Sequence, residues 1–175
     1  MKKHLITAFT FASLAATQYA NGQIWSIGKN DNQTTEFALA PDKYKDYLAH
    51  DFGYEDRYFL IGYSNEKTDF PYVIPGPSDS WGGTGGTSGW RTHETTILFG
   101  LEDVPLSDNW KLVIDIAENA VEQPPLLKVS VNGHDWKFQM PAGQNENAIT
   151  GDMNGSKEHI LEIPLNSSHL KQGGN

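Results

Sequence analysis

The sequence predicts an all-β domain folded as an antiparallel β-sandwich, and three observations lead to this prediction. From residue 95 onward, apolar residues recur at every second position, which is the period of a half-buried strand. Clusters of Gly, Pro, Asn and Asp separate these apolar runs and indicate turns. A helical period is almost absent, so the core is expected to form between facing sheets.

The alternation defines the expected strands. In WKLVIDI, residues Trp110, Leu112, Ile114 and Ile116 fall on one face, which is expected to be the core face. Asn132-Gly133 predicts a hairpin, because Asn-Gly is the strongest short-range signal for a two-residue turn between strands. Strands are therefore expected in RYFLIGY (57–63), TTILFGL (95–101), WKLVIDI (110–116), the hairpin arms 127–131 and 136–140, and HILEIPL (159–165).

One short helix is expected, in PDKYKDYL (41–48), where Pro41 suits the first helical position. Neither an internal repeat nor a second domain is visible in the sequence. Residues 23–175 have about the length of one domain, so we expect a single domain there.

The first 22 residues have the pattern of a secretory signal peptide. Lys2 and Lys3 precede an apolar run from Leu5 to Ala16, and small residues follow up to Gly22. The run is too short to span a bilayer, and no later segment is long and apolar enough to do so. The mature chain is therefore expected to begin at residue 23, to be secreted or periplasmic, and to have no membrane partner.

The composition narrows the function further. The chain has no cysteine, which removes disulfides, thiol nucleophiles and thiolate metal sites. Its net charge is −9, and removal of Lys2 and Lys3 leaves 11 basic residues against 22 acidic ones, a net charge of −11. Such a chain is expected to repel nucleic acid and anionic membranes.

The segment 70–93, FPYVIPGPSDSWGGTGGTSGWRTH, is the most unusual part of the chain. It is too rich in Gly and Pro for a long helix or strand, yet after Phe70 it holds three more large aromatic residues, Tyr72, Trp81 and Trp90. Planar rings beside short polar side chains suit the apolar faces and hydroxyl rims of sugars, although core packing of each ring is an equally good explanation. An arginine can also bind the carboxylate of a uronic acid, or simply pair with Glu94. The candidate carbohydrate-binding residues are Tyr72, Trp81, Trp90, Arg91 and His93.

No catalytic residue is assigned. Acidic residues cluster in HDFGYEDRYF (50–59), and Asp79 and Glu94 flank the aromatic segment, but acidic residues in loops are mostly solvated charges. The histidines lack ligand spacing, so no metal ligand is assigned. No cofactor is expected. A structural calcium ion stays an open alternative, because loop carbonyl ligands leave no spacing signature.

Several motifs, spread over nearly all of the mature chain, are similar to those of a known family: IWSIGKNDNQTTEFALAP, FPYVIPGP, TILFGL, WKLVIDI, VSVNG and HLKQGGN. They resemble the carbohydrate-binding-like domain of polysaccharide lyase family 4 rhamnogalacturonan lyases and of related secreted bacterial proteins. The resemblance implies a jelly-roll-like antiparallel β-sandwich. It also implies an accessory domain, because the catalytic residues of these lyases lie in a separate domain.

The resulting hypothesis is an exported, non-catalytic module of a polysaccharide-degrading enzyme, whose parent protein is expected to be a polysaccharide lyase. The module would bind plant cell-wall glycans, with pectic ones as candidates, or pack against a catalytic domain of the same protein. Two alternatives stay open. One is a lyase or glycosidase that uses Arg91, His93 and nearby carboxylates, and the other is a structural spacer that binds nothing.

The C-terminal residues lead to one more expectation. Gly173-Gly174-Asn175 has the composition of a turn that leads into another strand, and such a closing strand follows in the resembling family. The sandwich is therefore expected to lack its closing C-terminal strand, and the chain to be a fragment. Part of the inner face near Trp110 and Ile114 would then be uncovered.

Overall fold

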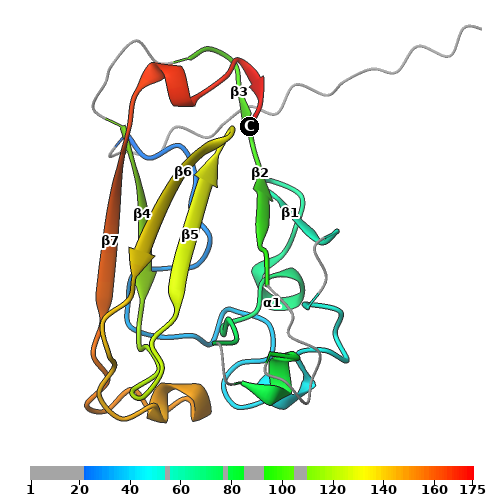
Figure 1. Cartoon of the computed structure of the whole chain (residues 1–175). Helices are drawn as coiled ribbons and strands as arrows, with labels where there is room; N and C mark the ends of the chain where they lie inside the picture. The colour runs from blue at the N-terminus through cyan, green and yellow to red at the C-terminus, as the bar shows by residue number, and fades with distance from the viewer. Residues whose placement is uncertain (1–21, 54–55, 77–78, 85–92, 105–109) are drawn as a thin grey trace, which may run out of the picture.

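A computed structural model describes residues 22–53, 56–76, 79–84, 93–104 and 110–175. Strands dominate these residues and the helices are short, which confirms the all-β prediction (Figure 1). The strands are β1 (Tyr58–Leu60), β2 (Thr96–Leu98), β3 (Gly100–Leu101), β4 (Trp110–Ile116), β5 (Leu126–Val131), β6 (His134–Gln139), β7 (His159–Leu165) and β8 (Gly173–Gly174). The helical segments are α1 (Glu66–Asp69) and the 3₁₀ turns η1 (Tyr44–Asp46), η2 (Ser80–Gly82), η3 (Asn147–Thr150) and η4 (Ser167–His169).

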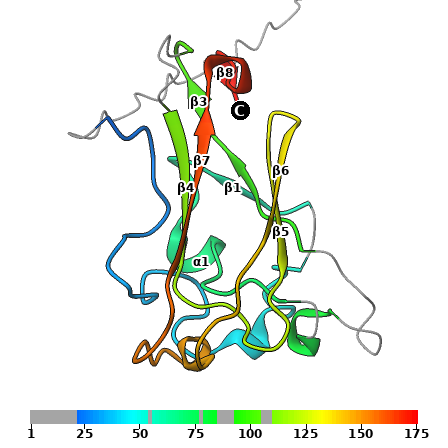
Figure 2. The same ribbon diagram turned by 60° about the vertical axis from the view of Figure 1, so that its left-hand side comes forward.

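Two antiparallel pairs form the larger part of the molecule. Strand β4 pairs with β7 along its whole length, with Leu112 opposite Ile163. Strands β5 and β6 form the hairpin predicted from Asn132-Gly133, and both turn residues have positive φ, 50° and 89°. Figure 2 shows the two pairs as separate layers. Every strand that the alternation predicted is present, within one or two residues for the four long strands.

The two layers share a core, which we call the larger core. Its buried members are Leu101, Ile163, Leu165 and Leu170. The apolar faces of β4, β5 and β6 pack around them, including Trp110 and Trp136. Alternation places these side chains inward and residues such as Lys111 and Glu162 outward, where those two form an ion pair.

The smaller core lies in the N-terminal part of the chain and consists of Ala38, Leu39, Tyr47 and Phe52. The β1–β2 pair lies in the same part of the chain and is parallel, with Phe59 opposite Ile97. Parallel pairing differs from the antiparallel arrangement that the sequence suggested. The connection between β1 and β2 is more than thirty residues long, which gives the chain room to return in the same direction.

Short helices form where local side chains cap them. The helix predicted over 41–48 shrinks to the 3₁₀ turn η1, because a segment with only Tyr47 buried has too little apolar face to stabilise several turns. The sequence analysis did not predict α1. Its start is explained by Asn65, whose side-chain oxygen accepts the Lys67 N–H at 2.9 Å.

The C-terminal residues are paired with strand β3. Gly173–Gly174 form β8 opposite Gly100–Leu101, and Asn175 exchanges two backbone hydrogen bonds with Phe99, at 2.8 and 3.0 Å. Trp110 and Ile114, which the sequence led us to expect partly uncovered, are half-buried against the larger core. Among the described helices, none is long and apolar enough to cross a membrane.

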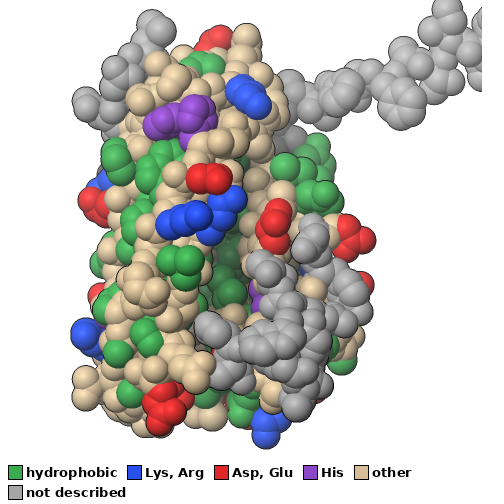
Figure 3. Space-filling view, viewed as in Figure 1, with side chains coloured by type: hydrophobic (Ala, Val, Ile, Leu, Met, Phe, Trp, Pro, Cys, Tyr) green, Lys and Arg blue, Asp and Glu red, His purple; other side chains and the backbone are tan. Residues whose placement is uncertain are grey.

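The surface seen from the side of Figure 1 is hollowed between the sandwich-like part and the part that carries β1 and β2 (Figure 3). Hydrophobic side chains form the floor of this hollow, and acidic and basic side chains lie on its rim. An open surface that offers both apolar and polar contacts therefore lies between these two parts.

Candidate functional site

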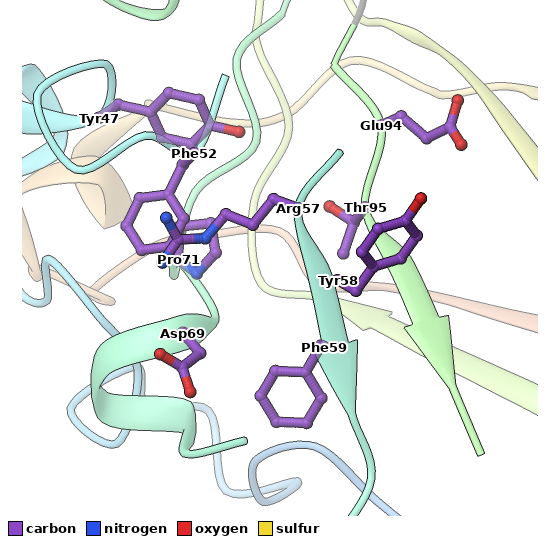
Figure 4. A pocket seen from close by; sticks show the side chains of 9 residues that line it. All are labelled: Tyr47, Phe52, Arg57, Tyr58, Phe59, Asp69, Pro71, Glu94 and Thr95. Carbon is purple, nitrogen blue, oxygen red and sulfur yellow. The ribbon is translucent and has the colours of Figure 1, made fainter. Parts of the chain in front are cut away.

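A second, shallow depression lies where β1 begins and where the chain enters β2, and we call it the β1 hollow (Figure 4). It is open to solvent and has a cavity volume of about 20 Å³, close to the space that one water molecule needs, so a larger ligand would lie on its surface. Its lining combines aromatic, charged and small polar side chains, from Tyr47, Phe52, Arg57, Tyr58, Phe59, Asp69, Pro71, Glu94 and Thr95. These residues come from four separate segments, so only the folded chain brings them together.

The floor of the β1 hollow is rigid and apolar. Phe52 belongs to the smaller core, and Phe59 points inward from β1 and is also buried. The Arg57 guanidinium lies over the Phe52 ring, 4.3 Å from its centre, and its Nη1 donates a hydrogen bond to the His50 carbonyl at 2.7 Å. The ring and the carbonyl together hold this cation in one place.

The rim of the hollow presents polar groups beside an exposed ring. Because side chains alternate along a strand, Tyr58 points away from the core while Phe59 points into it, and half of the Tyr58 surface is exposed. Thr95 and Glu94 reach the same rim from the segment before β2 (Figure 4). Glu94 Oε1 accepts a hydrogen bond from the Thr96 hydroxyl at 3.3 Å.

Asp69 lines the opposite side of the hollow, and its carboxylate already has partners. Its Oδ2 accepts the Asn65 N–H at 2.9 Å, and its Oδ1 accepts the Thr68 hydroxyl at 3.0 Å. The carboxylate therefore closes the turn around α1 while it adds negative charge to the hollow.

Tyr72, Trp81 and His93, three of the residues predicted from the aromatic segment, lie around Tyr47 and the smaller core. The rings of Trp81 and His93 both meet the Tyr47 ring edge-on, with centroids 5.7 and 5.4 Å away. Trp81 also meets Tyr44 at 5.3 Å, so its ring is held from two sides. Tyr72 packs against the smaller core, and its hydroxyl donates to the Ile149 carbonyl.

The structure thus gathers Tyr72, Trp81 and His93 around one core. Trp90 and Arg91 lie outside the described residues. In the described part of the chain, no three His, Asp or Glu side chains are arranged to hold a metal ion.

Burial raises the pKa of two tyrosines in this region. The pKa of Tyr47 rises to about 12 because its hydroxyl is buried, although the positive charge of Arg57 opposes the shift. The pKa of Tyr72 also rises to about 12, through burial first and the nearby carboxylate of Asp42 second. Both hydroxyls are therefore neutral at physiological pH, and the Arg57 charge stays available to groups in the hollow.

Sequence reasoning missed Tyr58 and Thr95 as site residues. It noticed the acidic residues around Arg57, weighed them as catalytic carboxylates and favoured solvated surface charge instead. The signal was present in RYFLIGY, where strict alternation places Tyr58 on the face opposite Phe59. The sequence could not indicate that the segment before β2 lies beside Tyr58, because this arrangement depends on the parallel pairing of β1 and β2.

The β1 hollow thus combines an aromatic floor with a polar rim on an all-β scaffold. A comparison with protein-family models places the chain in a family. Residues 23–175 match the CBM-like family described as polysaccharide lyase family 4, domain III, so the chain belongs to this family. The family resemblance noted in the sequence is confirmed. Neither the curated proteins nor the solved structures yielded a match to the chain.

Proposed function

We propose that this domain is an exported accessory module of a polysaccharide lyase, with a jelly-roll-like topology, and that it binds plant cell-wall glycan in the β1 hollow. Membership of a CBM-like lyase family supports the accessory role. The main support for this binding site is the position of Tyr58, a half-exposed ring on the rim of the hollow. The floor beside it is apolar, and the Arg57 cation is held over Phe52.

The chemistry of the hollow matches that of a sugar ring. One face of a pyranose is apolar and can stack on Tyr58, as amphipathic surfaces stack on aromatic rings elsewhere. Its hydroxyl groups can donate to Glu94, and they can exchange hydrogen bonds with the Thr95 hydroxyl and the remaining N–H groups of Arg57. Because the floor is already packed, little conformational entropy is lost when the sugar binds.

The residues of the aromatic segment have a supporting part in this proposal. Trp81 and His93 fix the position of Tyr47, which forms part of the wall of the hollow. The prediction that Trp81 or Trp90 itself stacks on the glycan is kept, and so is that of a contact from Arg91. Alanine variants of these residues belong in the same binding series.

The binding site is tested by replacing the exposed ring. Tyr58→Ala is expected to weaken binding to pectic or xylan fractions about 5- to 150-fold, as for the loss of an anchor ring worth about 1–3 kcal/mol. Affinity electrophoresis with each fraction measures the change. Tyr63→Ala is the matched control, because Tyr63 is 69% exposed and does not line the hollow. Equal binding by the wild type and Tyr58→Ala would show that the glycan binds elsewhere.

One observation favours packing against a catalytic domain as a second function. Tyr58, Leu60 and Leu98 are exposed together on the outward face of the β1–β2 pair, where Leu60 lies opposite Leu98. Exposed apolar side chains in a cluster are typical of a contact surface. If Leu60→Ser weakens association with the parent enzyme's remaining domains while Tyr58→Ala leaves glycan binding unchanged, packing is the better assignment.

A further inference from the structure

The charges that line the β1 hollow are unbalanced. Among the described residues that line it, Arg57 is the one cation. Asp69 and Glu94 contribute carboxylates from opposite sides of the hollow, Asp69 from α1 and Glu94 from the segment before β2 (Figure 4). The described lining thus carries one positive and two negative charges, in a chain whose net charge is −9.

Arg57 is poorly placed to bind a ligand carboxylate with both of its terminal nitrogens. Its guanidinium plane covers Phe52 at 4.3 Å, and Nη1 donates to the His50 carbonyl at 2.7 Å. Recognition of a carboxylate by arginine is strongest when two parallel N–H groups face it. With Nη1 engaged and one face covered by a ring, the guanidinium is better suited to donate to a single hydroxyl.

Glu94 is well placed to select against negative charge. Its side chain is exposed on the rim beside Tyr58, and its one hydrogen bond with a described residue, 3.3 Å from the Thr96 hydroxyl, uses only Oε1. Its carboxylate can accept hydrogen bonds from the hydroxyl groups of a sugar stacked on Tyr58. A uronate in the same position would bring a second carboxylate close to it, and like charges at such a distance repel.

We infer that the β1 hollow recognises neutral sugar residues and discriminates against uronates, so that the module binds the neutral parts of a cell-wall polysaccharide. This inference rests on the proposed glycan-binding function and specifies its ligand class. Glu94 would then act in two ways. It would accept hydrogen bonds from a neutral sugar, and its charge would repel the carboxylate of a uronate.

The test compares two glycan probes on the whole domain, residues 23–175, in EDTA at low ionic strength. Neutral β-galactan is expected to bind at least about 10-fold more tightly than polygalacturonate, measured by calorimetry and by affinity electrophoresis. Glu94→Gln is expected to raise polygalacturonate binding about 2- to 5-fold, the size typical of one exposed charge. Asp115→Asn removes the same charge from the outer face of β4, away from the hollow, and is expected to leave the preference unchanged.

The outcomes separate this inference from the function on which it rests. If polygalacturonate binds as tightly as galactan or more tightly, the neutral-sugar inference is wrong while glycan binding stands. If Asp115→Asn changes polygalacturonate binding as much as Glu94→Gln does, the discrimination comes from the overall charge and the role of Glu94 is refuted. If neither glycan binds, the proposed function fails and the inference fails with it.

Discussion

Tyr47 is the residue on which the smaller core and the candidate site meet. It is almost fully buried and forms part of the wall of the β1 hollow. Its ring is tilted against Phe52 and meets the rings of Trp81 and His93 edge-on. One side chain thus connects the aromatic segment to the floor of the β1 hollow. A buried phenol also has a consequence for the pH dependence of stability, because its ionised form is disfavoured in the folded state.

Because burial raises the pKa of Tyr47, we expect the free energy of unfolding to fall in alkali. Its pKa is 10.0 when unfolded and about 12 when folded, so the stability it provides is complete below pH 10 and is lost as the pH rises through 12. The shift corresponds to about 2–3 kcal/mol of unfolding free energy. Urea unfolding at pH 9 to 12 is expected to show this decline, with a contribution of the same sign from Tyr72.

Tyr47→Phe has no phenol at this position and is expected to show a shallower decline over the same pH range. Tyr63→Phe serves as the control, because Tyr63 is exposed. Identical slopes for the wild type and Tyr47→Phe would contradict the assignment of the alkaline transition to Tyr47.

At the scale of elements, the hairpin turn is the best-defined local structure. Gly133 has φ 89°, and an added Cβ would meet no atom within 4 Å, so the backbone angle alone makes glycine necessary there. Gly133→Ala is expected to cost about 1–2 kcal/mol, measured by urea unfolding. Gly100→Ala is the matched control, since its Cβ would lie 3.9 Å from the nearest atom and its φ is not positive. A neutral Gly133→Ala would show that the turn differs from the structure.

The neighbouring Asn132 shows what a local pattern cannot predict. Its side-chain amide donates to the His169 carbonyl at 2.8 Å and to Asn175 Oδ1 at 2.9 Å, so it joins the hairpin turn to the C-terminal segment. The Asn-Gly pair was sufficient to predict the turn, because turn type depends on adjacent residues. The long-range bonds of the same asparagine depend on how η4 and β8 pack, and no spacing in the sequence encodes them.

The same distinction holds for the strands and the site. Alternation predicted β4 and β7 closely, because each strand has one face on the larger core and one in solvent. It did not predict the parallel pairing of β1 with β2, since pairing direction depends on the path of a long connection. The β1 hollow follows from that pairing. Composition therefore pointed to the aromatic segment. Alternation in RYFLIGY could have placed Tyr58 on the outer face, but only the folded structure brings Glu94 and Thr95 to the same rim.

At the scale of the whole molecule, the larger core and the proposed binding surface lie in different parts of the described chain. The larger core fills the space between β4–β7 and β5–β6, while the β1 hollow is lined from the smaller core and from β1. The strand segment β2–β3 links the two parts, since β2 pairs with β1 and β3 pairs with β8, and Tyr72 links them again through its hydrogen bond to the Ile149 carbonyl. A change confined to the larger core should therefore alter stability without altering the shape of the hollow.

Ile163 provides the test of this division. It lies in β7, is 0% exposed and belongs to the larger core, so Ile163→Ala is expected to cost about 2–5 kcal/mol by leaving a cavity. Ile160→Ala in the same strand changes a side chain that is 49% exposed and is expected to cost less than about 0.5 kcal/mol beyond any change in strand propensity. Both values come from urea unfolding.

Glycan binding by Ile163→Ala, measured well below its melting temperature, is expected to equal that of the wild type, because no described lining residue of the hollow belongs to the larger core. If binding falls in proportion to stability, the hollow is shaped by the larger core as well, and the two parts of the molecule act as one.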